Sequence, residues 1–483
     1  MTDLEFKLID WAIISLYFIF LIYLTWQRDW EETDEETFLL SGRKMSLPAF
    51  VATLVSTWYG GILGVGEYSY QFGISQWLLF GFPFYVFSAL FAWLLAGKIR
   101  MNKALSLPEA VGNFYGERAG QFSAFPIFIL VSPAPYILML GLIFQYLTGG
   151  TGDFLWYAGA VAFFSVAYVI FGGFSAVVHT DMLQIVLMFG GFIGLLIFAG
   201  MNFGGLHSLW EHMPASYRDI TGGQDLQYIL VWFFIALWTF VDPSFHQRAA
   251  AAKSPATARK GIFVSILLWS IFDFLTMFSG IYGWAILGPD LAEPVMVYPY
   301  LANEILPLGF KGLFFVALLA TIMSTLDSYL FLSGQTLGRD LLAKHFPSVK
   351  NNTLTRISTV IAAVLGILLI IVYPSVIDLW YVIGSVMLPG LLIPVLGVYL
   401  RYFSLRAGWV LPTMIISIGV SLGWLVLGTL TSTTEYDYTF LGMEPFYPGL
   451  AVSILLWLAG RVGKGEKGVG VLEETEFSRE ITE

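Results

Sequence analysis

The chain is a succession of long apolar segments separated by short polar ones. Thirteen runs are predicted as helices that span a bilayer or nearly do so, because a hydrocarbon core of about 30 Å needs about 20 apolar residues. The runs are 8–27, 46–69, 76–98, 122–147, 154–176, 183–202, 228–247, 260–287, 309–332, 354–373, 376–400, 407–430 and 446–461. This pattern predicts an all-α polytopic membrane protein embedded in a lipid bilayer.

Composition supports this interpretation and excludes several functions. The sequence is 57% hydrophobic and only 12% charged, which is more apolar surface than a soluble domain can bury. It contains no cysteine, which excludes disulfides, thiolate metal sites and cysteine nucleophiles. The loops hold no phosphate-binding motif and nothing that indicates nucleic-acid binding, so transport driven by ATP hydrolysis within this chain is not expected.

The basic residues predict the orientation. With thirteen spans, all of the 24 lysines and arginines except Lys7, Arg218 and Lys311 fall on one side of the membrane. Because cytoplasmic loops carry the excess of lysine and arginine, we expect the N-terminus outside and the C-terminus in the cytoplasm. The expected location is the plasma (inner) membrane. The net charge of −10 comes mainly from the first cytoplasmic loop and the tail 473–483.

Hydroxyl side chains recur inside the apolar run 309–332. At helical spacing, Thr321, Ser324, Thr325 and Ser328 share one stripe, with Asp327 beside it. Polar groups inside a bilayer are costly unless they are hydrated or coordinated, and hard cations prefer oxygen ligands. The stripe therefore predicts an ion site. Hydrogen bonds within the helix would explain any one of these hydroxyls but not the whole stripe.

Two runs contain residues that interrupt helices. Four glycines lie between Gly60 and Gly66 in the second run, and Asp242-Pro243 lies near the end of the seventh. Counted from run 46–69, these are helices 1 and 6 of a ten-helix set. Matching breaks in two five-helix halves are typical of inverted-repeat transporters, whose site lies between the halves. Close packing would explain the glycines alone, but not the matching break in the other half.

This interpretation divides the chain into five parts. They are residues 1–44 (an N-terminal helix and an acidic loop), 45–202 (the first five-helix repeat), 203–402 (the second repeat), 403–462 (two C-terminal helices) and 463–483 (a cytoplasmic tail).

Four stretches carry motifs of a known family. They are Phe38 to Arg43, Tyr168 to Ala176 followed by Thr180-Asp181, Gln247-Arg248 followed by Ala258 to Gly261, and Thr321 to Asp327. Together they resemble the sodium/solute symporter family, which includes sodium-coupled sugar, proline, pantothenate and choline transporters. The resemblance covers roughly residues 37–402 and implies sodium as the coupling ion, with no other cofactor.

The resemblance also implies ion ligands. In that family one sodium is held by carbonyls of core helices 1 and 8 and by two helix-8 hydroxyls. The matching positions are Leu54, Thr57, Thr321, Ser324 and Thr325. Some members hold a second sodium between helices 5 and 8, where Asp181, Ser324, Asp327 and Ser328 correspond. Whether one or two ions bind stays open, since Asp181 could equally cap the helix that follows it.

The solute is the least determined part. The candidate contacts are Trp58, Tyr59, Gly60, Gly61, Trp238 and Asp242. The stretch Thr57 to Gly61 resembles the choline-transporting branch, in which an aromatic ring stacks on a quaternary ammonium, and it lacks the polar contacts of the sugar transporters. Because aromatics make up 17% of the chain, a packing role for these rings stays open. Asp273, inside run 260–287, has no assigned partner.

The resulting hypothesis is a secondary active transporter that carries sodium and a small organic solute into the cytoplasm by alternating access. Proton coupling on the same scaffold is the alternative, given the carboxyl groups in the apolar runs. A symporter-like membrane sensor is a further alternative, but it would need a long cytoplasmic C-terminal module. A channel would need a continuous polar pore, whereas the polar residues here cluster.

Overall fold

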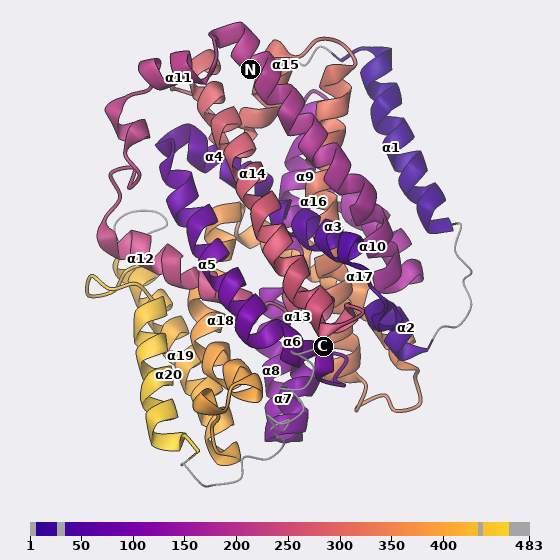
Figure 1. Ribbon diagram of the computed structural model, residues 1–483, viewed down its shortest axis with the longest axis vertical. Helices are drawn as coiled ribbons and strands as arrows, with labels where there is room; N and C mark the ends of the chain where they lie inside the picture. Colours follow the sequence, from indigo (N-terminus) through magenta and orange to yellow (C-terminus); the bar gives the residue numbers. More distant parts are fainter. Residues whose placement is uncertain (1–5, 27–33, 433–437, 463–483) are drawn as a thin grey trace.

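A computed structural model describes residues 6–26, 34–432 and 438–462, and these residues are almost entirely helical (Figure 1). Ten helical segments in this part of the chain are long and apolar enough to cross a membrane. Two shorter apolar helices flank them, α1 (Leu8–Trp26) and α20 (Phe446–Gly460). The prediction of an all-α membrane protein is confirmed, whereas the count of thirteen spans stays a prediction.

The two shorter helices account for two of the three missing spans, and the third is explained by α10 (Phe154–Phe203). The predicted runs 154–176 and 183–202 fall within this one element, without the loop that we expected between them. Its backbone leaves helical geometry at Gly173, where φ is 58° and ψ is −163°. A straight helix of 50 residues would be about 75 Å long, more than twice the hydrocarbon core. The turn at Gly173 therefore divides α10 into two helices that are each long enough to span.

Both predicted breaks are present. The first broken helix consists of α3 (Leu47–Trp58), a 3₁₀ turn at Tyr59–Gly61, and α4 (Ile62–Phe72). The second consists of α12 (Leu226–Ile235), a 3₁₀ turn at Ala236–Phe240, and α13 (Pro243–Ala251). Pro243 begins α13 because proline lacks an N–H group and suits the first turn of a helix. The prediction of two discontinuous helices is confirmed.

A third break separates α8 (Glu117–Leu130) from α9 (Ala134–Leu147), inside the predicted run 122–147. Two prolines, Pro133 and Pro135, begin the second of these helices. The sequence analysis missed this break, although the prolines are the signal that predicts it.

The remaining helices complete the bundle. They are α2 (Glu35–Leu40), α5 (Phe82–Phe91), α6 (Gly97–Met101), α7 (Leu107–Tyr115), α11 (Leu206–His212), α14 (Pro255–Leu287), α15 (Val297–Ile305), α16 (Phe310–Gln335), α17 (Asn351–Val372), α18 (Val376–Tyr399) and α19 (Ala407–Thr431).

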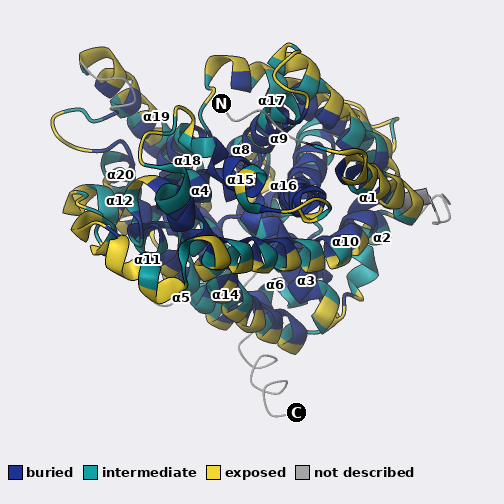
Figure 2. Cartoon of the chain, turned by 90° about the horizontal axis from the view of Figure 1, so that it is seen from above, coloured by how far each residue is buried: buried dark blue, intermediate teal, exposed yellow. Residues whose placement is uncertain are grey.

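The helix α16 lies at the centre of the molecule. Nearly every residue from Gly312 to Gln335 is buried, as expected for a helix that is covered on all sides. It packs against α10, α3 and α17, and the pair α19–α20 packs against α18 at the opposite edge from α1 (Figure 1). Seen from above, buried residues fill the middle of the bundle and exposed residues form its rim (Figure 2).

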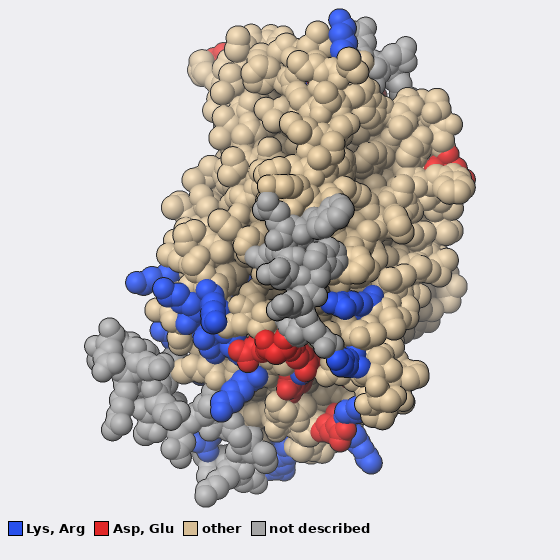
Figure 3. Space-filling model, turned by 90° about the vertical axis from the view of Figure 1, so that its right-hand side faces the viewer, with Lys and Arg blue, Asp and Glu red and all other residues tan. Residues whose placement is uncertain are grey.

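The outer surface fits a bilayer. Large apolar side chains such as Trp93, Phe163 and Val186 are exposed. Lysine and arginine gather at the lower end of the face in Figure 3, whereas few charged side chains show on its upper half. An uncharged belt with basic residues at one end is what the charge pattern of the sequence predicts. The tail 463–483 lies outside the described residues.

Candidate functional site

The hydroxyl stripe of α16 meets the first helix break. The Thr325 hydroxyl donates a hydrogen bond of 2.6 Å to the carbonyl oxygen of Thr57, the next-to-last residue of α3. A side chain at Gly60 would collide with Thr325, so glycine is required for this close approach. The structure therefore places one predicted hydroxyl ligand against one predicted carbonyl ligand. The other two predicted carbonyl ligands, those of Leu54 and Thr321, belong to buried residues on the same two helices.

The next hydroxyl, Ser324, points to α10. It donates a hydrogen bond of 2.5 Å to Asp181 Oδ1, and the Thr53 hydroxyl of α3 donates to Asp181 Oδ2. Asp181 is completely buried and lies within α10, eight residues after the turn at Gly173. The alternative that Asp181 caps a helix start is therefore wrong, because its carboxylate binds side chains from α3 and α16.

An arginine that the sequence analysis did not place in the site lies between these helices. Arg248 of α13 is completely buried. Its Nη2 atom lies 2.7 Å from Thr57 Oγ1, 3.0 Å from Thr53 Oγ1 and 2.8 Å from Ser328 Oγ. The same atom is 3.8 Å from Asp181 Oδ2. The sequence signal that could have placed it there is a basic residue shortly after the second break.

These contacts show how the set proposed for a second sodium is arranged. Ser328 and Asp181 both contact Arg248 Nη2, so their side-chain oxygens lie within about 7 Å of each other. Asp327 faces another way: it accepts a hydrogen bond from the Tyr168 hydroxyl in the first half of α10. Its Oδ1 atom is buried without a hydrogen-bond partner in the described part of the chain. The structure thus unites three of the four residues and separates Asp327.

A cavity of about 120 Å³ lies beside this cluster. A water molecule needs about 10–15 Å³ on this measure, so the space corresponds to about ten waters, the size of a small organic solute. The lining residues are mostly aromatic and come from both broken helices and their neighbours. They are Thr57, Trp58, Tyr59, Gly61, Val65, Phe80, Phe84, Leu130, Ser132, Pro135, Tyr136, Trp232, Ile235, Trp238, Asp242, Ser244, Asp273, Tyr329, Trp380 and Ile383.

Five of the six predicted solute contacts line this cavity. Gly60 does not; it lies instead against Thr325. Gly61 leaves room for the ring of Trp380, with which a larger side chain would collide. The sequence analysis missed Trp232 and Trp380, because aromatic residues are so frequent in this chain that none stands out.

Two carboxyl groups line the cavity in different surroundings. Asp242 begins α13 as its N-cap and accepts a 2.7 Å hydrogen bond from the backbone N–H of Ser244. Asp273, in the middle of α14, accepts a hydrogen bond from the Tyr85 hydroxyl of α5. The lining contains no lysine, arginine or histidine.

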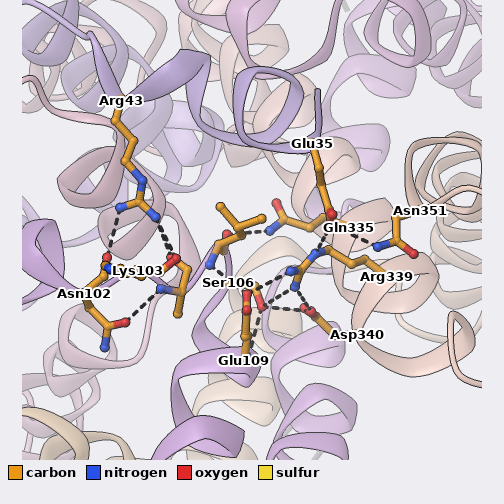
Figure 4. Close-up of polar contacts among 12 residues, drawn as sticks. Glu35, Arg43, Asn102, Lys103, Ser106, Glu109, Gln335, Arg339, Asp340 and Asn351 are labelled. Atoms are coloured by element: carbon orange, nitrogen blue, oxygen red, sulfur yellow. Dashed lines mark hydrogen bonds and ion pairs between the residues drawn. The ribbon is translucent and has the colours of Figure 1, made fainter. Parts of the chain in front are cut away.

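A second polar cluster lies near the end of α16 (Figure 4). Arg339 forms ion pairs with Glu35 of α2, Glu109 of α7 and its neighbour Asp340; the last two measure 2.9 Å each. Ser106 also donates to Asp340, at 2.8 Å. One guanidinium therefore ties three separate segments together at this end of the bundle.

Comparison with known proteins agrees with the family resemblance and the fold. A family model, "Sodium:solute symporter family", matches residues 38–403. The chain is 25% identical to the sodium/glucose cotransporter of Vibrio parahaemolyticus, over 77% of this chain and 76% of that protein. It is 29% identical to the sodium/pantothenate symporter of Escherichia coli over 61% of each chain. It is 24% identical to the osmoregulated proline transporter of Bacillus subtilis, over 92% of this chain and 94% of that one.

Solved structures show the same fold. A Na⁺-coupled sialic acid symporter superposes with a TM-score of 0.78 at 15% identity, over 94% of this chain and 97% of that chain. The transporter Mhp1 of the nucleobase-cation-symport-1 family superposes with a TM-score of 0.56 at 14% identity, over 87% and 92%. Because a family model covers most of the sequence and the fold agrees, the chain belongs to the sodium:solute symporter family and is a membrane transporter for sodium-coupled solute symport rather than an enzyme.

Proposed function

We propose that this transporter carries sodium and a small organic solute together into the cytoplasm by alternating access. One observation carries the proposal. Thr57 accepts the hydrogen bond from Thr325 at the predicted sodium site, and it also lines the cavity. The ion site and the solute site therefore share a residue at the first helix break. Two ligands bound at sites that share a residue favour each other when both stabilise the same conformation.

The sodium ligands in this proposal are the carbonyls of Leu54, Thr57 and Thr321 and the hydroxyls of Ser324 and Thr325. Oxygen donors of this kind suit a hard cation, and they belong to buried residues of α3 and α16. A second sodium would use Asp181, Ser324 and Ser328, with Asp327 adding negative charge nearby.

The solute in this proposal lies in the aromatic cavity, against Trp58, Tyr59, Gly61, Trp238 and Asp242. The chain enters the membrane with its N-terminus outside and its C-terminus in the cytoplasm. Residues 45–202 and 203–402 act as the two inverted repeats. The breaks that end α3 and α12 at comparable places support this division.

Uptake into proteoliposomes tests the coupling. Radiolabelled proline, choline and glucose are screened, and we expect at least one of them to accumulate under an inward sodium gradient, and not under a potassium gradient of equal size. By thermodynamic linkage, sodium should increase the affinity for the solute by the same factor as the solute increases the affinity for sodium. Uptake that is equal with sodium and potassium would contradict sodium coupling.

Proton coupling is a second candidate, and Asp327 favours it. Its carboxyl group is buried, has one oxygen without a partner, and forms no ion pair in the described residues. Such a group avoids the cost of a buried charge by binding a proton. If protons drive transport, a pH gradient alone should support uptake, and Asp327→Asn should abolish that uptake. If sodium drives it, the pH gradient alone should have no effect.

A further inference from the structure

The lining of the solute cavity contains acidic side chains but no basic ones. The cavity is lined by two carboxyl groups, those of Asp242 and Asp273. Its walls are the faces and edges of aromatic rings, which attract cations through their quadrupoles. A low-dielectric space with this lining favours a positively charged guest and disfavours an anion.

The charge of Asp242 is already used within the protein. As the N-cap of α13, it accepts a hydrogen bond from the Ser244 N–H, and its negative charge offsets the positive end of that helix. The Tyr329 hydroxyl also lies 3.4 Å from its Oδ2 atom. A solute that bound Asp242 would compete with these contacts.

Asp273 differs from Asp242 because it caps no helix and its described hydrogen-bond partners are neutral hydroxyl groups. It lies within α14, far from either helix end, and is 4% exposed. It accepts a hydrogen bond from the neutral Tyr85 hydroxyl, the neutral Tyr59 hydroxyl also interacts with it, and no ion pair in the described chain includes it. A buried carboxylate is costly without a cation, and Asp273, unlike Asp327, lines the cavity, where a cation from outside the protein can reach it.

The neighbours of Asp273 belong to the first helix break. The ring of Phe272 packs against Tyr59, with centroids 4.5 Å apart. One turn earlier on α14, Trp269 packs against Trp58 at 5.4 Å and accepts a 2.7 Å hydrogen bond from the Tyr59 hydroxyl. The carboxyl group is thus fixed beside the two aromatic residues that form the cavity wall at the break.

We propose that Asp273 is the anionic contact for the solute, and that the solute is a small organic cation with an ammonium group and no carboxylate. This inference rests on the proposed function, because it assumes that the aromatic cavity binds the transported solute. An anion would add a third negative charge to the cavity. A neutral polyol would find few hydrogen-bonding groups, since most of the lining is aromatic or aliphatic.

Two probes of equal shape isolate the charge. Choline is a quaternary ammonium, and 3,3-dimethylbutan-1-ol is its neutral analogue with carbon in place of nitrogen. Binding of each is measured with the purified full-length protein by thermal shift and by displacement titration, in sodium and in potassium. We expect the wild type to prefer choline at least tenfold, and only in sodium.

Three variants complete the test. Asp273→Asn keeps the size and the acceptor for Tyr85, and it should bring the preference for choline over its neutral analogue below threefold. Asp273→Glu keeps the charge and should retain a clear preference. Asp290→Asn, at an exposed position after α14, should behave as the wild type.

The outcomes separate this inference from the proposed function. If proline, glycine betaine, glucose or pantothenate binds in a sodium-dependent way while choline does not, the cationic solute is refuted and sodium-coupled transport stands. If choline binds with an unchanged preference in Asp273→Asn, Asp273 is not the anionic contact. If sodium changes neither the stability nor the binding of any probe, the proposed function and this inference both fail.

Discussion

Replacing Arg248 by methionine tests the network that joins both broken helices to α16. The guanidinium is completely buried and forms hydrogen bonds to Thr53, Thr57 and Ser328 with distances of 2.7–3.0 Å. Methionine has a similar length but no charge, so Asp181 would lose its cation while staying buried. Removing one partner of a buried ion pair costs about 3–5 kcal/mol. We expect a loss of this size in the free energy of unfolding.

The measurement is equilibrium unfolding in detergent micelles, monitored by tryptophan fluorescence. Arg118→Met, at an exposed position in α8, is the control and should change stability by less than about 0.5 kcal/mol. The double variant Arg248→Met with Asp181→Asn should recover about 1–3 kcal/mol, because it leaves no unpaired charge.

The single variant Arg248→Met should also respond differently to sodium. Without the guanidinium 3.8 Å away, Asp181 attracts an added cation more strongly, so sodium should stabilise Arg248→Met at lower concentrations than the wild type. A loss of stability below about 1 kcal/mol, together with no recovery on adding Asp181→Asn, would refute the assigned ion pair.

Three further substitutions test other parts of the site. Thr325→Val removes the donor to the Thr57 carbonyl at a cost of about 1–3 kcal/mol. It should raise the sodium concentration for half-maximal uptake about tenfold. Thr325→Ser keeps the hydroxyl group and should leave that concentration unchanged. Gly60→Ala forces a methyl group into Thr325 and should lower the free energy of unfolding by about 1–3 kcal/mol. The control Gly194→Ala, at a position with open space around it, should leave stability unchanged. Equal effects of the two substitutions would contradict the close approach of Gly60 to Thr325. Arg339→Gln should loosen the cluster of Figure 4 and speed the labelling of a cysteine introduced at buried Ala250 by a charged thiol reagent, measured in a chain that has no other cysteine. An unchanged labelling rate would show that this cluster does not close that end.

Much of the architecture followed from the sequence. Apolar length predicts spans, because a bilayer offers no hydrogen bonds to an exposed backbone. Gly60, Gly61 and Pro243 predicted the two breaks, because glycine and proline weaken a helix wherever they occur in it. The hydroxyl stripe from Thr321 to Ser328 was visible because helical periodicity is a property of the chain itself.

What each side chain faces was decided by the tertiary structure. Periodicity gives the direction of a residue around its own helix, but it does not say which neighbouring helix lies in that direction. Ser324 therefore meets Asp181, Thr325 meets Thr57, and Asp327 turns to Tyr168. These partners are more than 100 residues distant in sequence, and only the packing of α3, α10 and α16 brings them together.

The same reason explains what the sequence left out. In the sequence, Arg248 follows the end of an apolar run and Asp273 lies alone inside one. Nothing in their local sequence distinguishes an internal cation from a solute contact. Arg248 enters the network because α13 begins at a break that faces α3 and α16. Asp273 reaches the cavity because Trp269 and Phe272 of the same helix pack on Trp58 and Tyr59. A sequence determines which residues a membrane must force inward, whereas the packing of helices determines which of them meet.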